Sequence, residues 1–107
     1  METEILEELQ ERIIKSFLDA LVLAELRKGS AMSGYDVIAF IRRRFHRLVS
    51  SGTVYALLYS MERDGLIKGR LSGRKRVYVL TEKGEETIKI IMNAHERILS
   101  FMANLLR

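Results

Sequence analysis

The fold is decided by residues 50–80, which read SSGTVYALLYSMERDGLIKGRLSGRKRVYVL. Two serines and a glycine open a helix here, because small side chains can cap its first free N–H groups. Apolar residues then recur at three- and four-residue spacing and mark one buried helical face: Val54, Leu57, Leu58 and Met61. Asp64-Gly65 ends the helix, since glycine readily adopts the left-handed conformation beyond a helix C-terminus.

A short basic hairpin follows this helix. Residues 66–71 and 76–80 are rich in branched side chains and read as two strands around a Ser72-Gly73 turn. Three positive charges lie at the tip: Arg74, Lys75 and Arg76. A helix followed by a basic hairpin is typical of the winged helix, which commonly places its helix in a DNA major groove and its wing on phosphates.

The residues before this stretch supply two further helices. Residues 17–27 are apolar on all sides, which predicts a buried first helix, and Lys28-Gly29 gives it a basic last turn and a glycine stop. Ser33 and Asp36 resemble a capping box at the start of a second helix. We therefore predict a mainly α fold with a small β-hairpin, arranged as a winged helix-turn-helix over residues 17–80.

An amphipathic leader, residues 1–16, precedes the predicted domain. Its glutamates suit the positive end of a helix dipole, and its apolar residues fall on one face that extends into the next helix: Leu6, Leu9, Ile13 and Phe17. Two interpretations stand equally. The leader either covers the core of the domain or contacts a partner chain.

Residues 81–107 predict a single C-terminal dimerisation helix that begins near Thr81. Its apolar residues follow a heptad spacing, and a winged helix has too small a core to hide a helix of this length. We predict a dimer seam built from Ile88, Ile91, Met92, His95, Ile98, Leu99, Met102 and Leu105. The alternative is an intramolecular bundle with the leader. His95 is interpreted as a tolerated polar residue of the seam, with pH sensing as the weaker alternative.

Several of these motifs together resemble the PadR family of transcriptional regulators. Ala56 stands where many relatives have proline, and Met61 where they have leucine; both changes are mild, and alanine suits a helix interior better than proline does. The resemblance implies a winged helix-turn-helix that acts as a dimer. It covers about residues 17–84 and rests on Ser33–Asp36, Gly52–Leu58, Met61–Ile67 and Arg74–Gly84.

The predicted third helix offers its solvent face to DNA bases. Small residues at its start allow close approach to base edges, and hydroxyl groups can donate or accept hydrogen bonds. The resemblance implies that Tyr55 lies near DNA, whereas packing against the second helix is the alternative. Because no Arg, Asn or Gln lies in the first two turns, we expect specificity to lean on site spacing and DNA shape. The candidates are Ser51, Gly52, Thr53, Tyr55, Ala56, Tyr59 and Ser60.

Basic side chains around this helix are candidates for phosphate contacts. Residues 27–83 hold thirteen Lys and Arg against four Asp and Glu, whereas the rest of the chain holds five against ten. Positive charge is therefore concentrated on the predicted DNA-binding segment. The alternatives are favourable charge at a helix C-terminus and protection of a sheet edge. The candidates are Tyr35, Arg42, Arg43, Arg47, Lys68, Arg70, Arg74, Lys75 and Arg76.

The composition excludes several classes of protein. The 107 residues include no cysteine, so we expect no disulfide and a reducing cytoplasm as the location. There is no apolar run that could span a bilayer and no signal-peptide pattern. The two histidines are far apart, and no phosphate loop, metal-ligand spacing or nucleophile motif is present. We therefore predict neither an enzyme nor a bound metal or cofactor.

These observations favour a homodimeric, sequence-specific regulator that binds a two-fold related site in double-stranded DNA. The resemblance implies a repressor. It also implies a small aromatic effector at the dimer interface, where Met92, Leu99, Phe101 and Met102 are candidate lining residues. The alternative, from a different functional class, is a winged-helix module that binds another protein through its terminal helices and has little or no affinity for DNA.

Overall fold

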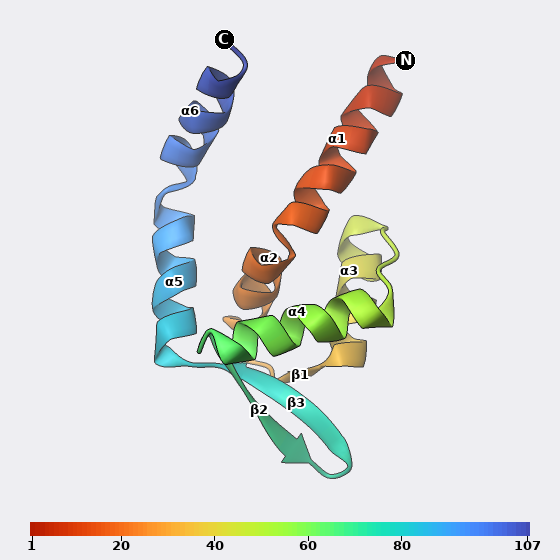
Figure 1. Cartoon of the computed structure of the whole chain (residues 1–107), viewed down its shortest axis with the longest axis vertical. Coiled ribbons are helices and arrows are strands. Elements are labelled where there is room, and N and C mark those ends of the chain that lie inside the picture. The colour runs from red at the N-terminus through yellow and green to blue at the C-terminus, as the bar shows by residue number, and fades with distance from the viewer.

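The computed structural model describes residues 1–107 and is mainly helical (Figure 1). Its winged helix-turn-helix, with α3 and α4 as the helix pair and β2 and β3 as the wing, has the predicted architecture. In chain order the elements are α1 (Glu2–Ser16), α2 (Leu18–Leu26), β1 (Met32–Ser33), α3 (Gly34–Phe45), α4 (Ser51–Arg63), β2 (Ile67–Ser72), β3 (Lys75–Leu80), α5 (Glu82–Asn93) and α6 (His95–Leu105).

Local sequence signals fix the ends of the helices in the domain. The Ser33 hydroxyl accepts a hydrogen bond from the Asp36 N–H at 3.1 Å, and the Asp36 carboxylate accepts one from the Ser33 N–H at 2.9 Å. This confirms the predicted capping box. Ser50 caps α4 by accepting a hydrogen bond from the Thr53 N–H at 3.1 Å. Gly65, with φ of 79°, follows α4 in the left-handed region, as predicted.

The strands form one antiparallel sheet in the order β1-β3-β2. The hairpin pairs Ile67 with Leu80 at its base and Ser72 with Lys75 next to its tip, where Gly73 has φ of 64°. β1 adds a third strand on the other edge of β3, whereas the sequence predicts only the two-stranded hairpin. A strand of two residues has no readable alternation, so its presence depends on the tertiary fold.

The core lies between α2, α3, α4, the sheet and the first turns of α5. α4 contributes Val54, Leu58 and Met61, which are buried as predicted, while Leu57 is half-buried. These anchors turn the opposite side of α4 toward solvent. The buried cluster is Leu18, Val22, Leu23, Leu26, Met32, Val37, Phe40, Ile41, Val54, Leu58, Met61, Ile67, Tyr78 and Ile88.

Both terminal helical segments are interrupted. Phe17, with φ of −108°, separates α1 from α2, and Ala94, with φ of −100°, separates α5 from α6. The prediction of a single C-terminal helix is therefore wrong. At the break, the Ala94 N–H donates to the Ile91 carbonyl three residues back, so the regular four-residue ladder is lost there.

α1 and α6 extend from the domain on the side opposite the wing (Figure 1). Neither helix contains a buried residue. The radius of gyration is 15.1 Å, against about 13 Å for a compact domain of this length. The apolar faces of the two helices are thus uncovered in the single chain, and the intramolecular bundle considered above does not form. No helix combines the length and apolar character that crossing a membrane requires.

Candidate nucleic-acid interface

The solvent side of α4 carries the residues predicted to contact bases. The Thr53 hydroxyl accepts a hydrogen bond from the Ser50 hydroxyl at 2.8 Å, so it is partly committed to the helix cap. Ser60 is half-buried and accepts a hydrogen bond from the Arg63 guanidinium at 3.5 Å, which leaves it at the edge of the face. The other candidates are exposed: Ser51, Gly52, Thr53, Tyr55, Ala56 and Tyr59.

Tyr55 combines the two roles that the sequence left open. Its ring lies against the backbone of Gly34 at the start of α3, where a β-carbon would come within 2.5 Å of Tyr55 Cε1. The tyrosine therefore packs on the second helix of the motif. It nevertheless keeps 52% of its surface exposed, so the same side chain faces solvent beside the start of α3.

A shallow cleft joins the start of α3, the solvent face of α4 and the wing. It has a volume of about 260 Å³ and brings residues from three separate segments of the chain together. Tyr35 and Tyr55 meet the basic wing here, so the sequence candidates on different elements form one continuous surface. The lining residues are Ser33, Gly34, Tyr35, Tyr55, Arg74, Lys75 and Arg76.

The wing presents most of its predicted cations to solvent. Arg74 and Lys75 are exposed at the tip, and Lys68 and Arg70 are exposed along β2. None of these four side chains makes an ion pair or a hydrogen bond within the chain, because every ion pair of the chain joins other residues. Free cations at the end of a hairpin are suited to contacts with an anionic polymer.

Arg76 differs from the other wing cations because it is paired with Glu62 of α4. Arg76 Nη2 donates to Glu62 Oε1 at 3.1 Å and to Oε2 at 2.9 Å, and the Gly69 N–H donates to Oε2 at 3.0 Å. The Gly69 N–H and then Arg76 lower the pKa of Glu62 below its ordinary value. The same hydrogen bond to Glu62 raises the pKa of Arg76.

The remaining phosphate candidates lie on or just after α3. Tyr35 is exposed in the first turn of α3 and belongs to the cleft described above. Arg42 and Arg43 are exposed near the end of the same helix. Arg43 lines a different depression, together with Glu25 of α2, so the structure does not bring Arg43 to the wing.

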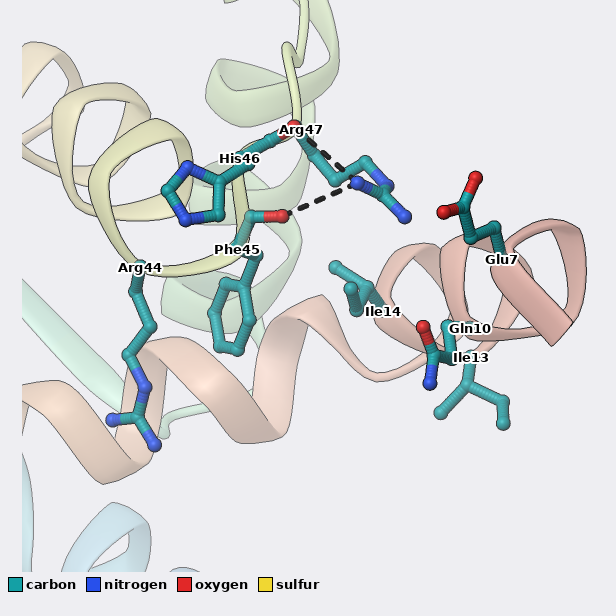
Figure 2. Close-up of a pocket in the computed structure, with 8 residues that line it drawn as sticks. All are labelled: Glu7, Gln10, Ile13, Ile14, Arg44, Phe45, His46 and Arg47. Atoms are coloured by element: carbon teal, nitrogen blue, oxygen red, sulfur yellow. Dashed lines mark hydrogen bonds between the residues drawn. The ribbon is translucent and has the colours of Figure 1, made fainter. Parts of the chain in front are cut away.

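Arg47 is turned toward α1. It lines a cleft of about 600 Å³ between the leader and the loop that follows α3 (Figure 2). Figure 2 shows its guanidinium pointing toward Glu7, whereas Arg44 points away from it. Arg47 also donates to the His46 carbonyl at 3.3 Å and is half-buried. The structure therefore separates Arg47 from the wing cations with which the sequence grouped it.

The predicted dimer seam divides into core and surface. Ile88 is 2% exposed and belongs to the core of its own chain, so its assignment to the seam is wrong. Ile91 is half-buried against that core, and Ile98 is half-buried beyond it. The other predicted residues are exposed and available to a partner: Met92, His95, Leu99, Met102 and Leu105.

Glu62 is the residue of this surface that the sequence interpretation missed. It lies in the last turn of α4, where the helix dipole disfavours a negative charge. An acid at such a position is unfavourable unless a cation lies nearby. Nothing in the local sequence identifies that partner as Arg76, because the hairpin register brings the two together.

The structure brings no group of three His, Asp or Glu side chains together as metal ligands. The described surface is thus built from a solvent-facing helix, a basic hairpin and the start of a neighbouring helix. This combination is suited to the grooves and phosphates of a duplex.

Comparison with known proteins gives consistent results. The chain is similar to a PadR-like transcriptional regulator from Bacillus cereus, at 26% identity and a TM-score of 0.74, covering 90% of this chain and 97% of that one. It is also similar to a PadR family transcription regulator from Clostridium difficile, at 27% identity and a TM-score of 0.73, covering 85% and 99%. A third structure, Bacillus subtilis PadR in complex with operator DNA, has 26% identity and a TM-score of 0.62, covering 70% and 46%. No curated protein matches the sequence.

The sequence profile of the transcriptional regulator PadR-like family matches residues 22–90. This range runs from α2 into α5 and contains the whole surface described above. It also contains each motif on which the sequence resemblance was based. The chain therefore belongs to the PadR-like family of transcriptional regulators, and it is not an enzyme.

Proposed function

We propose that the chain is a homodimeric repressor that binds a two-fold related operator in double-stranded DNA. The observation that carries this proposal is the continuous surface formed by Tyr35, the solvent side of α4 and the free cations Arg74 and Lys75. In this arrangement α4 enters the major groove, and the wing contacts the flanking phosphates. The relative from Bacillus subtilis, which was captured with operator DNA, supports the assignment.

The base-reading side of α4 is small and polar. Ser51 and Thr53 carry hydroxyl groups near the helix start, and Gly52 leaves room for close approach to base edges. No exposed Arg, Asn or Gln lies in these turns, so bidentate base recognition is scarce. Sequence preference then depends on the spacing of the half-sites and on the deformability of the DNA between them.

The homodimer is supported by apolar surface that the single chain leaves uncovered. Leu99, Phe101 and Leu105 of α6 are each more than 60% exposed, and Ile5 and Leu6 of α1 are at least half exposed. Exposed apolar patches of this kind mark interaction sites. Since both helices leave the domain opposite the wing (Figure 1), a partner bound to them leaves the DNA surface free.

A dimer bound over a promoter would block access to it, which is how we propose that repression occurs. The sign of regulation is proposed from the family resemblance. The cytoplasm is the proposed location, as it contains the DNA to be bound. Detection of the chain on a promoter within cells would show that it is located in the cytoplasm.

A direct test combines sedimentation with DNA binding. The full chain is sedimented alone and with a duplex containing its own upstream promoter, at low and at moderate salt. We expect a dimer that prefers this duplex to random DNA and releases it as salt rises. A monomer that is indifferent to DNA at both salt concentrations contradicts the proposal.

A residue-level test separates base reading from phosphate binding. Ser51→Ala and Thr53→Val should change the preferred sequence in a randomised-duplex selection, with little change in affinity for random DNA. If selection returns the same sequences for both variants and the wild type, then this end of α4 does not read bases.

A small aromatic effector at the dimer interface is a second part of the proposal. Met92, Leu99, Phe101 and Met102 are partly or largely exposed, and together they offer an apolar lining once a second chain covers them. Titration calorimetry with small aromatic acids and planar drugs checks this. An absence of heat, together with an unchanged affinity for the promoter, counts against an effector.

A protein-binding module is the alternative function, and the same uncovered faces of α1 and α6 favour it. In that case a different chain occupies them, and the winged helix serves as a scaffold. The sedimentation experiment distinguishes the two, because the alternative requires a mainly monomeric chain with no salt-sensitive affinity for DNA.

A further inference from the structure

One carboxylate links α4, the proposed recognition helix, to both strands of the wing. Glu62 lies in the last turn of α4, and its Oε2 accepts hydrogen bonds from the Gly69 N–H of β2 at 3.0 Å and from Arg76 of β3 at 2.9 Å. The base of the hairpin is held by Ile67 and Tyr78 in the core and by the pairing of β3 with β1, whereas Gly69 and Arg76 lie farther toward the tip. The carboxylate supplies a fixed point on each strand.

The site is shaped to hold the Arg76 guanidinium. A β-carbon at Gly69 would come within 2.5 Å of Arg76 Nη2, so the absent side chain provides the seat for the guanidinium. The Tyr78 ring lies on another side, with its centroid 5.7 Å from Arg76 Cζ. Such contacts between a cation and an aromatic face are attractive. Arg76 is thus held by a helix, an adjacent strand and an aromatic ring.

The position of Glu62 in the helix indicates that this contact is built rather than incidental. A negative charge in the last turn opposes the helix dipole, which costs free energy unless a partner compensates it. Here two donors, Gly69 N–H and Arg76, compensate it, and they also lower the pKa of the carboxyl group. The two contacts therefore offset the unfavourable position of the carboxylate in the helix.

We propose that Glu62 is a positioning residue that sets the angle of the wing to the recognition helix, so that Arg74 and Lys75 meet phosphates when α4 occupies the groove. Arg76 serves this contact and is not the phosphate ligand that the sequence suggested. The inference rests on the proposed function, since it concerns how the chain grips DNA. It adds Glu62 and Gly69 to the residues that determine the affinity for DNA, and it gives Arg76 a positioning role.

Two explanations of the role of Glu62 predict opposite changes in the affinity for DNA when its carboxylate is removed. If the carboxylate acts on DNA only through space, its removal makes the surface more positive and strengthens binding. If it positions the wing, removal weakens binding although the net charge has become more favourable. A loss of affinity in a more positive variant therefore has no simple electrostatic explanation.

The experiment measures binding of the full chain to a labelled duplex from its upstream promoter, by fluorescence anisotropy across a salt series. We expect Glu62→Gln to weaken binding about tenfold and to reduce the dependence of log Kd on log salt by roughly 1 to 2, as one or two wing phosphate contacts are lost. Asp64→Asn is the matched control, because this exposed acid lies two residues away and contacts neither strand of the wing. It should bind unchanged or more tightly.

A double-mutant cycle identifies the route of the effect. In a background that carries Arg74→Ala and Lys75→Ala, Glu62→Gln should have less than about a twofold effect, because the wing then has no tip cations to position. Full retention of the tenfold effect in that background overturns the proposal. Unchanged or tighter binding by Glu62→Gln in the natural background overturns it as well.

Further variants test the same contact from the side of the wing, and urea unfolding shows whether a loss of binding reflects a loss of folding. Gly69→Ala fills the seat of the guanidinium and should reproduce the effect of Glu62→Gln, whereas Arg76→Lys should retain more affinity than Arg76→Ala because lysine can still donate to Glu62. Urea unfolding of each variant confirms that it is folded at the assay temperature. A wild-type chain that binds no duplex overturns the proposed function itself. If the wild type binds and the Glu62, Gly69 and Arg76 variants bind equally well, this inference alone is overturned.

Discussion

The ring of Tyr55 in α4 occupies the place where a side chain at Gly34 would begin, so the recognition helix and the helix before it meet through an aromatic ring and bare backbone. The contact sits at the rim of the surface that also contains Tyr35 and the wing tip. A change at position 34 is therefore transmitted to the proposed DNA surface through Tyr55.

We predict that Gly34→Ala reduces the free energy of binding to DNA by more than it reduces the free energy of unfolding. The added methyl group displaces the half-exposed end of the Tyr55 side chain, which can move into solvent, so we expect a loss of stability of about 1 kcal/mol or less. Urea unfolding and anisotropy measure the two effects. In a Tyr55→Ala background the same substitution should leave affinity unaltered, since no ring remains to be displaced.

Loss of the cap on α4 should reduce stability. Ser50→Ala removes the oxygen that accepts the Thr53 N–H and should lower the free energy of unfolding by about 1 kcal/mol. Urea denaturation followed by circular dichroism measures this. Ser51→Ala is the matched control, because the hydroxyl of Ser51 caps nothing. Equal losses in the two variants would mean that the cap contributes nothing specific.

The wing tip should act on DNA without regard to sequence. Arg74→Ala should weaken binding to promoter and random duplexes alike, and should lower the slope of log Kd against log salt by roughly 0.9. Lys89→Ala removes one exposed positive charge from α5 and serves as the control. If Arg74→Ala keeps both its affinity and its salt slope, the wing tip does not touch phosphate.

A charge on the apolar face of α6 should prevent self-association. Leu99 is 63% exposed in the single chain, so Leu99→Glu costs little in the monomer but places an unpaired charge in the proposed interface. Sedimentation equilibrium should show a shift toward monomer. Leu71→Glu, on the exposed outer part of the wing, should sediment like the wild type. Identical association of all three proteins would contradict a seam on α6.

The contact between Glu62 and Arg76 should make stability depend on pH in one direction. Because the pKa of Glu62 is lowered in the folded chain, chiefly by the Gly69 N–H and then by Arg76, its carboxylate stabilises the fold above the unfolded pKa of about 4.3. That contribution is lost as pH falls through the lower folded pKa. The wild type should therefore be more stable than Glu62→Gln near neutrality, and the difference should close in acid. Urea unfolding at several pH values measures this gap, and a gap that widens in acid would contradict the assignment.

Features that depend on near neighbours in the chain could be predicted from sequence. Each helix end depends on residues close to it in the chain: Ser33 and Ser50 cap helix starts, and the left-handed Gly65 follows a helix end. Local chemistry therefore determines where these helices begin and end. The buried positions of α4 follow the helical period in the same way. The order of helix and basic hairpin then indicated a winged helix, and the family resemblance agreed with it.

Features that depend on contacts across the fold could not be predicted from the sequence. The break at Ala94 contradicts local propensity, because alanine is the best helix former. The burial of Ile88 depends on the packing of α5 against the domain. The pairing of Arg76 with Glu62, and the turn of Arg47 toward α1, depend on elements that only the tertiary structure brings together.

The uncovered state of α6 links its shape to the amount of protein present. The helix has eleven residues and buries none of them, whereas isolated helices shorter than about 12 to 15 residues are marginal in water. In the proposed dimer the partner's surface would stabilise this helix, so the ordering of α6 and the association of two chains would be one event. If this proposal holds, α6 would be only partly helical at low protein concentration, and binding to DNA would rise steeply once the concentration allows the proposed dimer to form.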